Sequence, residues 1–306
     1  MTTIFGTSTS AFYERSLTDL TALRKQAEET QAEMSSGQRL QRSSDDPVAA
    51  SRLRSLARAD TLDKVDEAAA NRATSDLTLT DDALSQFATV VTRIQELATQ
   101  AASSTLSDAQ RKGIGAEVTQ LQENLVALAN ARDSSGHALF GGESAADAYT
   151  LDAAGNATYA GTAAAGALSL GNGQSVTRGL TGPDFLNFTS GGASVDLLAV
   201  TKTLADALTS GSGGATAANA ALSTLGDGLT SIANAQTVVG SRLNWVELNV
   251  DRRTAMSEQR AVEQTEVGGV DLTESIAKLQ NTMLVLEASQ ASFSKLANLS
   301  LFSVLN

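Results

Sequence analysis

Apolar residues recur at alternating intervals of three and four near both ends of the chain. Near the start, the positions with this spacing are Leu20, Leu23, Ala27, Thr30 and Met34. Near the end they are Leu272, Ile276, Leu279, Met283, Leu286, Gln290, Phe293 and Ala297, with Leu296, Leu299, Leu301 and Phe302 widening the apolar surface. Because this spacing places each set on one face of a helix, it predicts two long helices of about 50 Å each.

A helix with such an apolar seam is not stable alone. Ordering it costs about 1 to 2 kcal/mol per residue, and only burial of the seam offsets that cost. The terminal helices can pair with each other or with neighbouring subunits, and we expect both to be largely disordered in the free monomer. A seam usually packs within its own chain, but that interpretation loses weight here because apolar positions continue to Phe302 and Leu305. The predicted assembly interface comprises Leu20, Leu23, Ala27, Met34, Leu272, Ile276, Leu279, Met283, Leu286, Phe293, Leu296, Leu299 and Phe302.

Further helices are predicted inward of the ends. Helical spacing marks Leu77, Leu84, Phe87, Val91, Ile94, Ala98 and Ala101, then Ile114, Val118, Leu121, Leu125 and Leu128, and on the C-terminal side Val239, Leu243, Val246 and Val250. The polar segment between the first two sets provides Ser107 as an N-cap for the second helix. Segments from both halves of the chain are therefore expected to form a rod of antiparallel helices.

The middle of the chain differs in kind. Residues 141–230 hold 16 of the 24 glycines, and their only cations are Arg178 and Lys202, against seven acids. Residues 149–161 predict a hairpin of two short strands around a turn from Asp152 to Asn156. Helical spacing returns in residues 195–208, and glycine-rich residues 211–219 predict a loop.

These patterns together predict a mainly α protein with a β-rich insert. The fold would be a long antiparallel helical rod or coiled coil formed by both termini, with a small β-containing tip domain. The expected division is terminal coiled-coil helices at residues 1–40 and 270–306, a helical rod domain at 41–140 and 225–269, and a β-rich outer domain at 141–224.

Charge and composition exclude several functions. The net charge of −12 argues against nucleic acid, because phosphate binding needs a concentrated basic surface, and the basic residues are spread among acids as on solvated helix faces. The chain has no cysteine, which excludes disulfides and thiolate chemistry. The sequence contains no apolar run of 18 residues, so no segment is expected to span a membrane. The first 20 residues lack a cleavable signal, so export would need another route.

Candidate chemistry is sparse. Asp46 before Pro47 is typical of a helix start, although a metal or acid–base role for the pair Asp45 and Asp46 is an alternative. His137, the only histidine, is interpreted as a loop residue rather than part of a triad. The spacing around Asp152 fits a hairpin turn better than a calcium loop, and the glycine-rich stretches lack the phosphate-binding patterns. No catalytic residue, cofactor site or metal site is predicted.

Three segments together resemble the flagellin-like axial proteins of the bacterial flagellum: MSSGQRLQRSSDDPVAASRL at 34–53, ARDSSGHALFGG at 131–142 and LANLSLFSVLN at 296–306. Within that family, SDDPVAAS at 44–51, GHALFGG at 136–142 and LSLF at 299–302 are most similar to the proteins of the hook–filament junction. At the position of the first of these motifs, flagellins usually carry a DDAAGL-type sequence. The chain departs from the family at Ser43, where proline is common, and at Ala138, where an aromatic residue is usual.

The resemblance implies a structural, non-enzymatic subunit of an extracellular flagellum, located at the junction between hook and filament. Its terminal helices would pack into an inner tube, with copies of itself, hook-associated protein 1 and flagellin as neighbours and an export chaperone on the C-terminal helix. One alternative is a flagellin or flagellin-like minor filament protein. Another is a glycan-binding or enzymatic module in the insert, for which Tyr149, Tyr159, Phe185 and Phe188 are the available aromatic residues.

Overall fold

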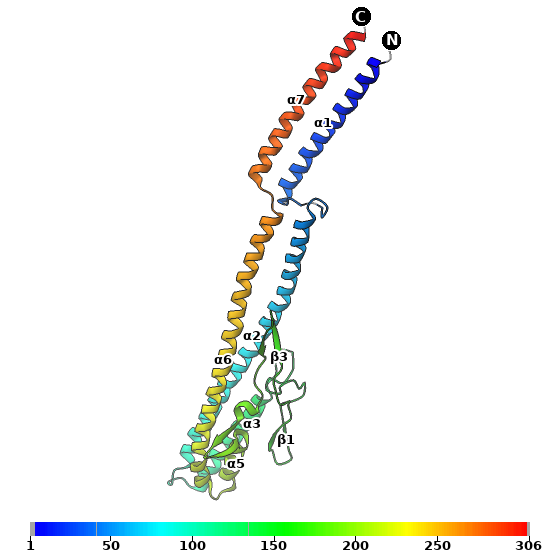
Figure 1. Cartoon of the computed structure of the whole chain (residues 1–306). Coiled ribbons are helices and arrows are strands. Elements are labelled where there is room, and N and C mark those ends of the chain that lie inside the picture. Colours follow the sequence, from blue (N-terminus) through cyan, green and yellow to red (C-terminus); the bar gives the residue numbers. More distant parts are fainter. Residues whose placement is uncertain (1–3, 41, 134, 305–306) are drawn as a thin grey trace. The chain divides into compact units, whose positions relative to one another are not determined.

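The computed structural model, drawn in Figure 1, describes residues 4–40, 42–133 and 135–304. The chain divides into two compact units. The first unit contains both ends of the chain, up to Thr61 and from Met256; the second runs from Leu62 to Ala255. Helices α2 (Pro47–Ala101) and α6 (Gly214–Gly268) contribute residues to both units. The predicted fold class is confirmed, because long helices dominate and the strands occur only in small antiparallel pairs.

In the first unit, α1 (Ile4–Ser36) packs along α7 (Leu272–Val304). The segments that join these helices to α2 and α6 meet in a short antiparallel bridge between Gln38 and Gly269. The backbone N–H of Arg39 donates to the Gly268 carbonyl at 2.9 Å, and the N–H of Val270 donates to the Gly37 carbonyl at 3.2 Å. These hydrogen bonds join the segment that follows α1 to the segment that precedes α7, although the two are far apart in the sequence.

The start of α2 is capped by Asp46. Its Oδ1 accepts from the N–H groups of Val48 at 3.2 Å and Ala49 at 3.0 Å, while Pro47 occupies the first helical position, where no N–H is needed. The Ala49 N–H, helped by Arg39, outweighs the opposing effect of burial and holds the pKa of Asp46 below its ordinary value. The predicted helix start is confirmed.

The second unit is organised around an apolar core between α2, α3 (Asp108–Ala129), α5 (Leu197–Ser210) and α6. Phe87, Phe140 and Phe185 are fully buried and meet edge to face or tilted, with ring centroids 5.0 to 6.0 Å apart. They come from α2, from the loop after α3 and from the short helix α4 (Pro183–Leu186). The aromatic cluster therefore fastens the middle segment to the helices.

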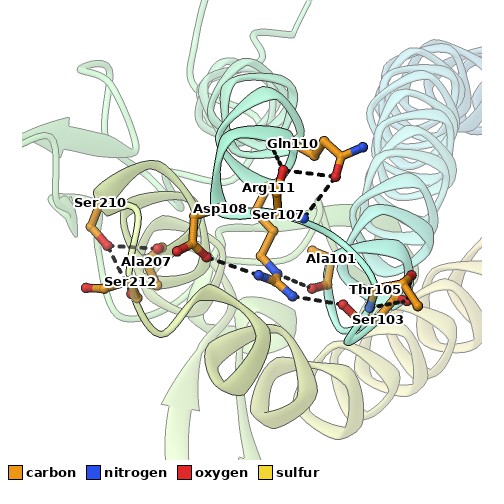
Figure 2. A network of polar contacts seen from close by, with 10 residues as sticks. All are labelled: Ala101, Ser103, Thr105, Ser107, Asp108, Gln110, Arg111, Ala207, Ser210 and Ser212. Atoms are coloured by element: carbon orange, nitrogen blue, oxygen red, sulfur yellow. Dashed lines mark hydrogen bonds and ion pairs between the residues drawn. The ribbon is translucent and has the colours of Figure 1, made fainter.

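Figure 2 shows the turn between α2 and α3, which a buried arginine closes. Ser107 and Gln110 form a reciprocal capping box at the start of α3, as the predicted N-cap requires. Arg111, only 9% exposed, donates to the carbonyls of Ala101 at 3.0 Å and Ser103 at 2.8 Å at the end of α2. The interpretation of the basic residues as solvated is wrong for Arg111, because its guanidinium satisfies carbonyl groups that a helix end leaves free.

The strands form three separate antiparallel hairpins. They are β1 (Tyr149–Leu151) with β2 (Ala157–Tyr159), β3 (Ala167–Gly171) with β4 (Gln174–Thr177), and β5 (Asn187–Ser190) with β6 (Ala193–Asp196). The first confirms the predicted hairpin: Oδ1 of Asp152 accepts from the N–H groups of Ala154 and Asn156, each at 2.8 Å. Each hairpin pairs only with itself among the described residues.

The loop after α3 is fixed by glycines and by a buried charge cluster. Gly142 has φ of 72°, and a side chain there would collide with Thr162. Asp133 is 4% exposed at its side chain and accepts from the backbone N–H groups of Ser135 at 2.8 Å and His137 at 2.9 Å. Arg178 reaches both this carboxylate and that of Asp76, so the loop is tied to α2 and to the end of β4.

The start of α6 differs from the expected bounds of the loop before it. The loop predicted for residues 211–219 ends early, because α6 begins at Gly214; Gly211, with φ of 86°, ends α5, and the alanine-rich residues after Gly214 favour a helix. The three-part domain division remains a prediction. Within the described residues, no helix is long and apolar enough to cross a membrane.

Candidate functional site

The predicted seam of α1 lies against α7. Leu20, Leu23, Ala27 and Met34 are each partly buried, and Thr30, on the same face, is 2% exposed. The Thr30 hydroxyl donates to the Gln26 carbonyl at 2.9 Å, so this buried polar group is satisfied within its own helix. The spacing of these positions is that of a helix pair with a narrow contact face.

The predicted seam of α7 divides into a covered part and an exposed part. Leu279, Leu286 and Phe293 are partly buried against α1, and Ser275 and Thr282 on the same face are 8% and 7% exposed. Leu272, Ile276 and Met283 are 53%, 44% and 57% exposed. At 100° per residue, these three lie beside the covered residues on one broad apolar stripe. Helix α1 therefore covers only one edge of the stripe.

The contact between the two helices includes a pair of aromatic rings. Tyr13 of α1 and Phe293 of α7 meet nearly at right angles, with centroids 5.4 Å apart. Next to them, Phe12, Ser16, Asp19, Leu20, Ser289, Ser292 and Phe293 line an open groove of about 200 Å³. The groove exists because the serine side chains that line it are small. Phe12, which also lines it, is 46% exposed.

Several predicted interface residues lie beyond what can be placed. The side chains of Leu296, Leu299 and Phe302 fall outside the described part of the structure, although their backbone continues α7. Conversely, sequence reasoning missed Tyr13, Ser275 and Thr282 as contact positions. The last two are polar and so carry no apolar signal, but they continue the spacing of Leu279, Leu286 and Phe293, which was the signal that could have identified them.

In the first unit, ion pairs join the N-terminal part of α2 to the C-terminal part of α6. Arg52 forms a bidentate pair with Glu263, its Nη2 lying 2.8 Å from Oε2, and it lowers the pKa of that carboxyl. Asp60 accepts from Nε of Arg260 at 2.8 Å and from Nε2 of Gln264 at 2.6 Å. These contacts fix the register of the two helices beneath the α1–α7 pair.

The residues considered for chemistry make structural contacts in the described part of the chain. Asp46 caps α2, while Oδ2 of Asp45 accepts from the N–H of Arg42 at 2.8 Å. His137 lies in a loop, as predicted, with Nδ1 3.6 Å from Oδ2 of Asp133. No group of three or more potential metal ligands occurs among the described residues.

The aromatic residues of the insert are used in packing. Tyr149 is 3% exposed and its ring lies 5.4 Å from that of Tyr159, Phe185 is fully buried, and Phe188 packs against the apolar core. A groove of about 450 Å³ does exist near these hairpins, but alanine, valine, leucine, serine, threonine and one aspartate line it. Stacking on a sugar needs an exposed aromatic face, which these four residues do not offer together.

Part of the chain is similar in sequence to known flagellar proteins. Residues 8–145 match the bacterial flagellin N-terminal helical region. Over 135 residues the chain is 31% identical to flagellar hook-associated protein 3 of Salmonella typhimurium, a match that spans 44% of this chain and 43% of that relative.

Solved structures extend the likeness in fold to most of the chain. A putative flagellar hook-associated protein from Vibrio parahaemolyticus superposes with a TM-score of 0.67 at 19% identity, over 74% of this chain and all of the other. The flagellar junction protein FlgL from Legionella pneumophila gives 0.59 at 14% identity, over 71% of this chain and 99% of the other. Residues 8–145 are thus similar to the N-terminal helical region of bacterial flagellin, and the chain has the fold of these solved structures.

Proposed function

We propose that this protein is a structural subunit of the bacterial flagellum and forms the junction between hook and filament, on which flagellin assembles. The observation that carries the proposal is the exposed edge of the α7 stripe. Leu272, Ile276 and Met283 remain exposed while α1 occupies the other edge. Leaving such a surface in water forgoes roughly 25 cal/mol per Å² of apolar area, which a neighbouring subunit would recover.

The proposed assembly interface combines both edges of the stripe. Leu279, Leu286 and Phe293 hold α1 and α7 together, and Leu272, Ile276 and Met283 contact the next subunit. Ordering of the paired helices and incorporation of the subunit into the flagellum then occur in one step. The ordered helices present the apolar surface that the neighbouring subunit covers, and its burial offsets the cost of ordering them.

The proposed partners are other copies of this chain, hook-associated protein 1 on the hook side, flagellin on the filament side and an export chaperone that holds the C-terminal helix. The protein would act outside the cell as part of the flagellum, after export without a cleaved signal. The names of the matched hook-associated and junction proteins support this assignment. A catalytic role is not part of it.

Deletion of the gene in its own bacterium tests the proposal. Electron microscopy should show hooks without filaments, and an immunoblot should find flagellin in the medium. A plasmid copy of the wild-type chain should restore filaments. Intact or merely thinned filaments in the deletion strain would contradict the junction role and favour a minor filament protein instead.

A further inference from the structure

The groove of about 450 Å³ in the second unit runs along one edge of strand β6. Ser194, Val195 and Asp196 all line it, although successive side chains of a strand point to opposite faces. A groove that touches three consecutive residues therefore lies beside the strand, not above or below it. Its other wall belongs to α5 and α6, with lining residues that include Ala199, Val200, Thr203, Ala217, Ala220 and Thr224.

The backbone of β6 presents free hydrogen-bonding groups along this edge. The loop between β5 and β6 consists of two glycines with positive φ, so the turn hydrogen bond joins Ser190 and Ala193. Bonded and non-bonded pairs alternate along an antiparallel ladder, and the next pair is Thr189 with Ser194. The N–H and C=O of Ser194 therefore point away from β5. Within the described residues, no backbone hydrogen bond outside the hairpin involves them.

Asp196 supplies the charge of the groove wall. Its Oδ1 accepts from the N–H of Ala199 at 3.0 Å and so caps α5, and within the described part of the chain no cation pairs with the carboxylate. Burial raises the pKa of Asp196 and outweighs the N–H groups of Ala199 and Leu198, which lower it. Lys202, further along α5, pairs with Asp206 instead. A cationic side chain in the groove would stabilise ionised Asp196.

We propose that this groove binds an extended peptide segment of a partner protein, which adds a third strand beside β6 and places a lysine or arginine against Asp196. Main-chain hydrogen bonds to Ser194 hold the segment, and its alternate side chains lie on α5 and α6. The alanine and threonine side chains of this wall are small, so they accommodate valine-sized residues of the segment. The inference goes beyond the junction role and does not depend on it.

The synthetic peptide Ac-TVTVKVT-NH2 tests the charge preference on the purified full chain. Its addition to nitrogen-15-labelled protein should shift the amide signals of Ser194 and Asp196, and exchanging its lysine for glutamate should weaken binding by about tenfold or more. Asp196→Asn is the matched variant, because asparagine caps a helix as well as aspartate does but carries no charge. The two peptides should bind this variant with equal affinity. Equal affinity for wild type, or no shifts at about 1 mM peptide, would overturn the proposal.

Methylation of the peptide backbone tests the added strand while the protein stays unchanged. The N–H groups of alternate residues point to the same edge of an extended strand. Methyl groups on the even-numbered nitrogens therefore block one edge of the peptide, and methyl groups on the odd-numbered nitrogens block the other. One of these peptides should bind as the parent does, and the other should bind at least tenfold more weakly. Equal affinities of the two would refute the strand pairing.

A single thiol reports where the peptide lies. The chain has no cysteine, so Ala220→Cys introduces the sole thiol, in the wall of the groove. The lysine peptide with an activated disulfide at one end should label it at least tenfold faster than Ser241→Cys. Ser241 is exposed about 30 Å further along α6, so it controls for labelling without binding. Equal labelling rates would place the peptide outside the groove and contradict the proposal.

Sedimentation distinguishes a foreign segment from a second copy of this chain. If a partner protein supplies the segment, the lysine peptide should leave the oligomeric state of the wild-type chain unchanged. Self-association that the peptide reverses, and that Asp196→Asn weakens, would identify another copy as the occupant and overturn the proposal. Deletion of the gene and the resulting filament count test the junction role separately, so either proposal can fail while the other stands.

Discussion

Nη2 of Arg178 lies 3.0 Å from Oδ2 of Asp133, and this contact ties the end of β4 to the loop after α3. The same guanidinium lies 2.9 Å from Oδ2 of Asp76 on α2. Both carboxylates are almost fully buried, at 4% and 6% side-chain exposure, whereas Arg178 keeps one third of its side chain in water. One cation therefore balances two buried anions that are distant in sequence.

Replacing Arg178 by methionine should destabilise the second unit. The change leaves two buried carboxylates without their cation, and removing one partner of a buried pair costs about 3 kcal/mol. Urea unfolding followed by circular dichroism measures the loss. Arg72→Met is the matched control, because Arg72 is exposed on α2 and should change the unfolding free energy by less than about 0.5 kcal/mol. Equal effects of the two changes would show that the cluster contributes no stability.

The same cluster predicts a dependence on pH. Burial raises the pKa of Asp133, but the N–H groups of His137 and Ser135, with the charges of His137 and Arg178, outweigh it and leave the pKa below its ordinary value. A lowered folded-state pKa stabilises the protein above the unfolded-state value, and this stability is lost as the pH falls through the folded-state value.

The destabilisation caused by Asp133→Asn should therefore be largest near neutral pH and shrink below about pH 4, where the unfolded-state carboxyl takes up its proton. Urea unfolding of both proteins at a series of pH values measures the difference. A constant difference between pH 7 and pH 3 would rule out a contribution from ionised Asp133.

The turn at Gly142 should tolerate no side chain. At φ of 72°, a Cβ would lie 2.1 Å from Oγ1 of Thr162 and 2.8 Å from the Ala164 carbonyl oxygen, so Gly142→Ala combines backbone strain with collision. Gly173 has φ of 75° but open space around it, so Gly173→Ala should cost only about 1 to 2 kcal/mol. Thermal unfolding should rank Gly142→Ala as clearly the more damaging; the reverse order would refute the steric argument.

Truncation of Phe87 should leave a cavity in the aromatic cluster. Phe87→Ala removes a fully buried ring that contacts Phe140 and Phe185, and we expect a loss of about 3 to 5 kcal/mol. Val65→Ala, at a position of α2 that is 65% exposed, serves as the control within the same unit and should be nearly neutral. Denaturant midpoints of the two variants decide the matter.

Met283→Asp tests the exposed edge of α7. Met283 is 57% exposed in the single chain, so only an intermolecular role would make a charge there harmful. We expect an immunoblot of isolated flagella to show incorporation reduced by tenfold or more. Asn281→Asp adds the same charge on the opposite side of the helix and should incorporate normally. Normal incorporation of Met283→Asp would remove the exposed edge from the interface.

Local patterns in the sequence were sufficient for much of the fold. The spacing of apolar residues located the helices, Ser107 and Asp46 located two helix starts, and Asp152 located a hairpin, because each of these depends on residues within one or two turns of chain. The bounds of α6 were less accurate, since glycine at 213–214 resembles a loop until the alanines that follow are weighed.

Contacts between distant segments could not be read in the same way. Asp76, Asp133 and Arg178 come together only after the loop folds onto α2, and nothing in their local sequence marks them as partners. Division of the α7 stripe into covered and exposed edges depends likewise on where α1 lies, because the apolar pattern alone gives the width of a stripe but not how much of it one partner fills.

The self-contained hairpins of the insert have a consequence for tolerance of change. Since each pairs only with itself among the described residues, lengthening the β3–β4 turn at Asn172 and Gly173 disturbs no neighbouring ladder. Apart from Gly173 and its two chain neighbours, no described residue has a heavy atom within 4 Å of where a Cβ on Gly173 would lie. A foreign peptide grafted there would be displayed on a closed stem, and closing a longer loop costs only about 0.6 kcal/mol for each doubling of its length. The segment is thereby suited to carrying epitopes or affinity tags.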